Sequence, residues 1–176
     1  MSVTLTYIRP GDTVVDATCG TGQDTVVLAR AVGSEGRVYA FDIQISAHLL
    51  TEAYLKSHGF TNVHLVMKSF VSMSEHIPER SAAAVVFNLG YLPGGDHSIT
   101  TKADTTLEGL EAALRTIRPG GVVTVVMYDG HNEGAEEKKA VLEWAEALDQ
   151  RRYHVAYVSL LNQKNHPPEI LWITKK

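Results

Sequence analysis

The sequence predicts a doubly wound α/β fold: one domain spanning residues 1–176, with a seven-stranded, mostly parallel sheet and an antiparallel last strand. Short β-rich runs alternate with segments of helical periodicity along the whole chain, which is typical of a parallel sheet covered by helices on both faces. A glycine turn joins the first strand to the first helix, as in folds that bind nucleotides. The last two strands are too close for a crossover helix, so we expect them to be antiparallel.

The strands are expected where short apolar or alternating runs occur. These runs cover residues 13–17, 37–42, 62–67, 82–88, 121–128, 153–161 and 169–174. Two helices are expected between the first three strands, one from Gly22 to about Ala31 and one over 44–58, where Gly59 supplies a C-terminal stop.

Two further helices are predicted to be amphipathic covers of the sheet. Segment 103–117, which Pro119-Gly120-Gly121 follows and ends, carries one apolar stripe made of Leu107, Leu110, Leu114 and Ile117. Segment 135–149 has an apolar side made of Val141, Trp144, Ala145 and Leu148. Its other side is expected to be largely charged, through Glu136, Glu137, Lys138, Lys139 and Glu143.

Composition narrows the class of protein. A hydrophobic content of 44% suffices for one core, and no run approaches the roughly 20 apolar residues of a membrane span. Without a secretion signal at the N-terminus, we expect a cytoplasmic protein with no membrane partner. No metal site is expected, because the eight histidines are scattered and Cys19 is the only cysteine. The sequence leaves a homodimer open.

The net charge of −4 gives no bulk support for a nucleic-acid partner, since proteins that bind phosphates usually present a basic face. A local patch can still serve, and basic residues cluster in the last third of the chain. They are Lys138, Lys139, Arg151, Arg152, Lys164, Lys175 and Lys176. The alternative is that these are ordinary solvated charges.

The turn over residues 16–24 (DATCGTGQD) lies where the first strand becomes the first helix. Gly20 and Gly22 let the backbone approach a ligand closely, and Thr18 belongs to the same turn. Asp42 follows Gly20 by 22 residues, at the end of the second strand. At this spacing a carboxylate accepts hydrogen bonds from the two hydroxyls of an adenosine ribose.

Two cofactors fit that geometry, and the residues favour S-adenosylmethionine (SAM) over NAD. The third glycine of the dinucleotide fingerprint is replaced by Thr25, and Asp16 before the turn would repel a pyrophosphate but suits the cationic methionine end of SAM. Ser69 and Phe70, after the third strand, are candidates to border the adenine. The alternatives are that the glycines only form a turn and that Phe70 only packs against the next helix.

The loop after the fourth strand, NLGYLPGGDH over residues 88–97, is expected at the same edge of the sheet. The Asn88 side-chain oxygen and the Leu89 carbonyl can hold the N–H groups of an amine nucleophile, and Tyr91 can stack on a flat ring. A general base is not obligatory, because SAM carries its own leaving group. Asp96 or His97 can take the proton; alternatively, residues 93–95 form a turn with Asp96 as its hydrogen-bonding partner.

Taken together, the motifs resemble the tRNA wobble-uridine methyltransferases of the MnmM (YtqB-like) family, formerly described as rRNA methylases, which have the class I, Rossmann-like methyltransferase fold. They are DATCGTGQDT (16–25), AFDIQ (40–44), NLGYLPGGDHSITT (88–101), YDGHNEGAEE (128–137) and LNQKNHPPEI (161–170). The resemblance covers nearly the whole chain, and NLGYLPGGD is its most specific part. Asp129 stands where the family pattern has proline.

The resemblance implies methyl transfer from SAM, leaving S-adenosylhomocysteine (SAH), to the primary amine of 5-aminomethyl-(2-thio)uridine in the anticodon arm of tRNA. It implies a cofactor site lined by Asp16, Gly20, Gln23, Asp24, Asp42 and Gln44. It also implies that Asn88, Tyr91 and His131 face the substrate. A methyltransferase of a small amine or of another RNA such as rRNA stays open, as does a SAM-binding module without catalysis.

Three polar residues of the last loop are expected near the rim of the same site. They are Asn162, Gln163 and Asn165, which can read the base or the phosphates or can simply be hydrogen-bonding loop residues.

Overall fold

The computed structural model describes residues 1–92, 94, 99–130 and 132–176. Its seven-stranded sheet has the order β3-β2-β1-β4-β5-β7-β6. The strands are β1 (Thr13–Asp16), β2 (Arg37–Phe41), β3 (Val63–Val66), β4 (Ala82–Asn88), β5 (Ile117–Met127), β6 (Tyr153–Val158) and β7 (Glu169–Lys175). The helices are α1 (Ser2–Leu5), α2 (Gln23–Val32), α3 (Ile45–His58), the 3₁₀ turn η1 (Phe70–Ser72), α4 (Met73–His76), α5 (Ala103–Thr116) and α6 (Asn132–Glu146).

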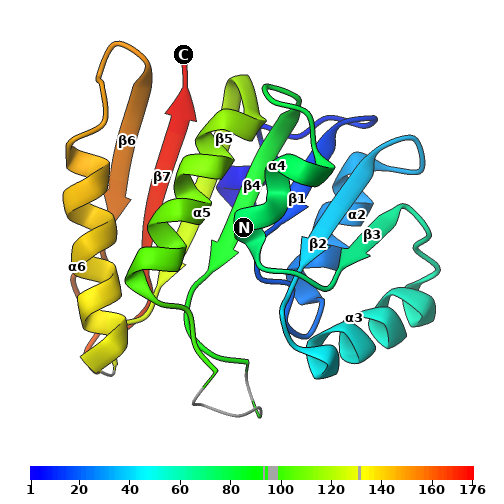
Figure 1. Ribbon diagram of the computed structural model, residues 1–176, viewed down its shortest axis with the longest axis horizontal. Coiled ribbons are helices and arrows are strands. Elements are labelled where there is room, and N and C mark those ends of the chain that lie inside the picture. Colours follow the sequence, from blue (N-terminus) through cyan, green and yellow to red (C-terminus); the bar gives the residue numbers. More distant parts are fainter. Residues whose placement is uncertain (93, 95–98, 131) are drawn as a thin grey trace.

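The strand directions confirm the predicted mostly parallel sheet. β7 pairs antiparallel with β5 and β6, and the other neighbours pair parallel. In Figure 1 the β7 arrow accordingly runs opposite to that of β4. The chain moves outward from β1 to β3 and returns to place β4 beside β1. Ligands of open α/β sheets bind at the carboxyl ends of the strands beside such a reversal.

The core has two layers because successive residues of a strand point to opposite faces of the sheet. Val15 and Val85 belong to a cluster with Leu110 of α5, on the face that α4, α5 and α6 cover. Val14 and Ala84 belong to a second cluster on the other face, with residues of α2. In Figure 1, α5 lies in front of the strands and α6 lies beside it, at the β6 edge of the sheet.

Several boundaries differ from those expected. The helix expected over 103–117 ends at Thr116, and β5 begins at Ile117 and continues through Pro119-Gly120-Gly121, with an irregular register against β4. A Cβ at Gly121 would lie 2.9 Å from the Arg118 carbonyl oxygen, so this part of the strand requires glycine. The last helix covers 132–146 instead of 135–149, and β6 ends at Val158.

No helix among the described residues is long and apolar enough to cross a membrane. The described residues also contain no group of three or more histidine, cysteine or acidic side chains that could hold a metal ion.

Candidate active site

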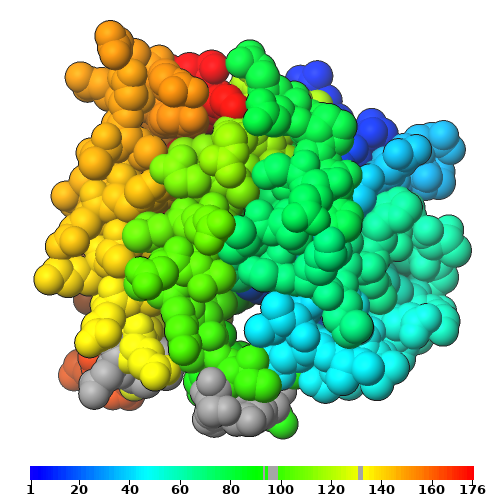
Figure 2. Space-filling model, viewed as in Figure 1, coloured from blue at the N-terminus to red at the C-terminus, as the bar shows by residue number. Residues whose placement is uncertain are grey.

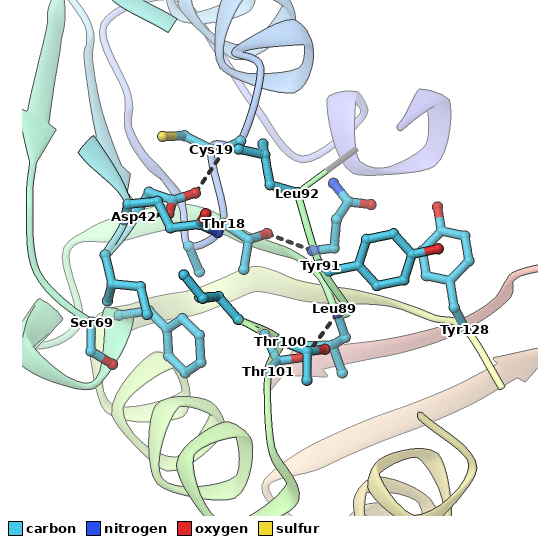
Figure 3. Close-up of a pocket in the computed structure, with 18 of the residues that line it drawn as sticks. Thr18, Cys19, Asp42, Ser69, Leu89, Tyr91, Leu92, Thr100, Thr101 and Tyr128 are labelled. Atoms are coloured by element: carbon cyan, nitrogen blue, oxygen red, sulfur yellow. Dashed lines mark hydrogen bonds between the residues drawn. The ribbon is translucent and has the colours of Figure 1, made fainter. Parts of the chain in front are cut away.

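A cavity of about 760 Å³ opens at the carboxyl ends of β1, β2, β3 and β4. Ten of the predicted site residues line it: Thr18, Gly20, Gln23, Asp24, Asp42, Gln44, Ser69, Phe70, Asn88 and Tyr91. In Figure 2 the surface is hollowed between the start of α3 (cyan) and the segment before α5 (green). Figure 3 shows Asp42 and Ser69 on one side of the cavity, with Tyr91 and Tyr128 on the other.

The Asp42 carboxylate is held at the glycine turn by two backbone donors. The Gly20 N–H donates to it at 3.1 Å and the Gln44 N–H at 3.0 Å. Gly20 has φ of +51°, a conformation that side chains other than glycine rarely adopt. A carboxylate offers about four acceptor positions, so Asp42 can accept two more hydrogen bonds from a ligand in the cavity. These are the acceptor positions that the two hydroxyls of a ribose diol require.

The Asp16 carboxyl, which the sequence analysis expects to contact the cofactor, does not line the cavity. Asp16 is 0% exposed, and its carboxyl accepts hydrogen bonds from the Thr25 hydroxyl at 2.6 Å and the Thr18 N–H at 3.2 Å. Burial raises the pKa of Asp16 to about 7, against the opposing Thr25 hydrogen bond, and the Asp24 charge adds to the rise. Asp16 therefore shapes the turn from beneath.

Gly22 also lies outside the cavity lining. It is the N-cap residue of α2, with φ of +83°, and a Cβ there would lie 3.0 Å from Thr51 of α3. The Thr51 hydroxyl donates to the Gly20 carbonyl at 3.0 Å. Gly22 thus permits the close packing of α2 and α3 that fixes the turn, while Gly20 faces the cavity.

Asn88, the last residue of the buried strand β4, has a fixed orientation. Its N–H donates to the Thr18 hydroxyl at 2.7 Å, and its side-chain Nδ2 donates to Asp24 Oδ2 at 2.6 Å. A carboxylate only accepts hydrogen bonds, so the nitrogen of the Asn88 amide must face Asp24 and the oxygen must face away. That oxygen has no hydrogen-bond partner among the described residues. Asn88 therefore presents an acceptor to a ligand.

The position of Phe70 is compatible with both roles that the sequence allows, bordering the adenine and packing against neighbouring elements. It lines the cavity, and its ring also packs edge-on against Phe87 with centroids 5.4 Å apart. A Cβ at Gly109 of α5 would lie 2.3 Å from the Phe70 ring, so the glycine makes room for it. Ser69 is the N-cap residue of η1, and its hydroxyl accepts from the Val71 N–H at 3.4 Å.

We call residues 89–101, between β4 and α5, the acceptor loop. Among its described residues, Tyr91 lines the cavity with 42% exposure and forms an isolated β-bridge with Thr100. The candidates Asp96, His97 and, beyond this loop, His131 lie outside the described residues.

Tyr128 is a site residue that the sequence reasoning missed. It follows β5, lines the cavity and is 45% exposed. Partial burial raises the pKa of Tyr128, and the nearby Asp24 charge adds to this, so the phenol stays neutral. Its place directly after a predicted strand, at the same sheet edge as Asn88, was a signal that could have found it.

In the loop between β6 and β7, the residue that lines the cavity is not one of those expected. Asn162, Gln163 and Asn165 are exposed and do not line the cavity, whereas His166 does. His166 Nδ1 lies 3.1 Å from Asp129 Oδ1. Where a long loop returns to the sheet depends on tertiary contacts, which sequence spacing does not give.

Asp129 belongs to an ion-pair group beside the cavity. Lys138 pairs with Asp129 at 2.7 Å and also with Glu169. Partial burial disfavours the charge of Lys138, but its hydrogen bonds to the two carboxylates outweigh this and raise the pKa of the lysine. This group connects α6 to the start of β7, and His166 lies at the rim of the cavity.

Comparisons with known proteins agree with this geometry. Residues 38–174 match the family described as "Putative rRNA methylase", and residues 1–69 also match the protein-L-isoaspartate(D-aspartate) O-methyltransferase family. An Arabidopsis thaliana protein named tRNA (mnm(5)s(2)U34)-methyltransferase, chloroplastic, is 39% identical over 170 residues, which are 91% of this chain and 62% of the plant protein. The chain thus spans less than two thirds of that relative's length.

Two solved structures are similar over nearly all of the chain. A "putative rRNA-methylase" from Clostridium thermocellum has a TM-score of 0.97 and 42% identity, and covers 99% of this chain and 94% of its own. A "putative methyltransferase" from Streptococcus mutans, solved in complex with SAH, has a TM-score of 0.90 and 33% identity, with the same coverage of 99% and 94%. The chain therefore belongs to the family described as "Putative rRNA methylase", and its fold is that of the class I, Rossmann-like methyltransferases.

Proposed function

We propose that this protein is a SAM-dependent N-methyltransferase that acts on the primary amine of 5-aminomethyl-(2-thio)uridine at the wobble position of tRNA. The observation that carries the proposal is the orientation of Asn88, whose amide nitrogen is committed to Asp24 and whose oxygen is left to accept. An acceptor at the end of β4 selects a substrate that donates hydrogen bonds, as an amine does. The name of the plant relative supports the choice of nucleoside.

The described residues fit SAM. Asp42 has acceptor positions left for the ribose, Ser69 and Phe70 border the place of the adenine, and Gly20 lets the backbone approach. The turn links the donor and acceptor sides of the cavity, because Gly20 holds Asp42 while Thr18, two residues earlier, holds Asn88. A ligand lying over this short turn reaches both residues.

Methyl transfer from SAM requires mainly that the protein hold the amine in position beside the methyl group. Bound SAM supplies a methyl on a sulfonium: the nitrogen–carbon bond forms with the amine lone pair, the carbon–sulfur bond breaks, and SAH and a proton leave. Asn88 accepts an N–H of the amine and so aims its lone pair. The same hydrogen bond strengthens as the nitrogen becomes cationic, which favours the transition state over the bound substrate. Asp96 and His97 remain candidates for taking the proton.

Tyr91 and Tyr128 offer two exposed aromatic rings in the lining of one cavity. Bases of single-stranded RNA loops are commonly held by stacking on such rings, and a wobble base lies in a loop. We expect the anticodon arm to contact this side of the cavity, with His166 at its rim.

The test is methyl transfer from labelled SAM to two substrates in parallel: tRNA from cells that lack the modification, and a pool of small primary amines. We expect label in tRNA, and mass spectrometry of its nucleosides should show 5-methylaminomethyl-(2-thio)uridine. Label only in the amine pool would identify a small-molecule methyltransferase, which the net charge of −4 favours. Tight SAM binding without transfer to either substrate, or to rRNA, would identify a binding module.

A further inference from the structure

Glu137 of α6 is buried, although Glu136 and Lys139 near it in the sequence are exposed. It is 3% exposed, which corrects the expectation that it lies on the solvent side of its helix. Its carboxylate accepts the Thr106 hydroxyl of α5 at 2.6 Å and the Thr101 hydroxyl of the acceptor loop at 2.8 Å. A buried carboxylate is costly unless it is hydrogen-bonded, so these contacts hold the carboxylate in place. Glu137 itself does not line the cavity.

Thr101 closes the base of the acceptor loop. Its hydroxyl oxygen accepts the Gly90 N–H at 2.8 Å, and its own N–H donates to the Gly90 carbonyl at 3.1 Å. A hydroxyl has a single proton. Because that proton goes to Glu137, a lone pair of the oxygen is directed at Gly90. Figure 3 shows Thr101 beside Leu89, at the foot of the segment that leads to Tyr91.

We propose that Glu137 is a positioning residue for the substrate: through Thr101 and Gly90 it fixes the base of the acceptor loop and thereby the place of Tyr91 in the cavity. The inference rests on the proposed function, because it takes Tyr91 to contact the substrate. Tyr91 follows Gly90 directly, and Gly90 has φ of +123°, a conformation that residues other than glycine rarely adopt. Small displacements of positioning groups lower rates severely, so a distant carboxylate can matter for transfer.

The test compares Glu137→Ala with the matched control Thr106→Val. The control removes the other hydroxyl that donates a hydrogen bond to Glu137. Thr106 is buried, as Glu137 is, and its replacement leaves Thr101 and Gly90 unchanged. Three quantities are measured: the KM for undermodified tRNA, the Kd for SAM, and the amide hydrogen exchange rate of Gly90 by NMR. For Glu137→Ala we expect a KM about tenfold higher, a Kd within about twofold of the wild type, and Gly90 exchange at least about tenfold faster. The control should change none of the three by more than about twofold.

A second pair of variants keeps the test decisive if Glu137→Ala does not fold. Glu137→Gln preserves volume but has one acceptor oxygen for two hydroxyls, and it should raise Gly90 exchange and KM in the same direction. With Thr101→Val already present, Glu137→Gln should have no further effect on either quantity, because the route between the two residues is broken. Additive effects, or Gly90 exchange as slow in the Glu137 variants as in Thr106→Val, would overturn the proposal.

The two proposals fail separately. If the wild-type protein methylates no tRNA, the proposed function is wrong. The exchange rate of Gly90 still decides whether Glu137 fixes the loop, since it is measured without substrate.

Discussion

Replacing Asn88 by alanine tests the acceptor role on which the proposed function depends. The variant removes the one side-chain oxygen that β4 offers to an amine, and leaves Asp24 without the donor at 2.6 Å. A hydrogen bond to a group that becomes charged contributes about 1.5–3 kcal/mol. With about 1.36 kcal/mol per tenfold change in rate, kcat should fall roughly 10- to 150-fold.

The assay is transfer of labelled methyl from SAM to undermodified tRNA under saturating conditions, with SAM affinity measured by calorimetry. SAM binding should change by less than about twofold, because the ribose contacts of Asp42 are untouched. Asp24→Asn is the matched variant: its amide oxygen can still accept from Asn88, but its nitrogen can also donate, so the orientation is allowed and no longer enforced. The loss in kcat should therefore be smaller than for Asn88→Ala. A kcat within about twofold of the wild type for Asn88→Ala would refute the acceptor role.

Three further outcomes follow from the site. Asp42→Ala should weaken SAM binding about tenfold or more by calorimetry, since charge-assisted hydrogen bonds worth roughly 1.5–3 kcal/mol are lost; unchanged affinity would contradict its ribose role. Tyr128→Ala should raise the KM for tRNA about 5- to 150-fold if a base stacks there, at roughly 1–3 kcal/mol, whereas Tyr128→Phe keeps the ring and should stay near the wild type. The pKa of Asp16 is raised from 3.8 to about 7, so the unfolded chain loses this proton first, and Asp16 destabilises the fold increasingly as pH rises from about 4 to 7. Asp16→Asn should therefore flatten that decline and raise stability at pH 7 in urea titrations; an unchanged slope with pH would show that Asp16 is ionised throughout.

Much of the fold could be predicted because each element carries its own signal. The buried strand β4 and the apolar stripe of α5 could be predicted because both are visible as local patterns in the sequence. The connection between β6 and β7 is too short for a crossover helix, so antiparallel pairing of these two strands could also be predicted. The helical period of α6 also indicates that Glu137 is buried, which the prediction of a charged side did not take into account. Glu137 precedes Val141 by four residues and Trp144 by seven, which places it on the apolar side of α6 rather than the charged side.

The differences between the expected and the observed cavity lining concern side-chain direction and distance, which sequence spacing does not encode. Asp16 is the last residue of β1 and Asp42 directly follows β2, yet one carboxyl is buried under the turn and the other lines the cavity, because their immediate surroundings differ. The choice of His166 over Asn165 in the last loop depends on Asp129, which is 37 residues away from His166 in sequence. Such contacts become visible only when the chain is folded.

The arrangement around Asn88 explains how this fold can achieve methyl transfer without a dedicated base. The leaving group departs as a neutral thioether, so the protein need only hold a neutral amine in line with the methyl. Asn88 is suited to this because β4 is buried along its length, Thr18 holds the Asn88 backbone, and Asp24 prevents the amide from turning. An aspartate in place of Asn88 would face Asp24 at 2.6 Å, where two carboxylates must share a proton. The neutral amide therefore supplies an acceptor at the same position without that conflict, and its orientation is set by the fold before any substrate binds.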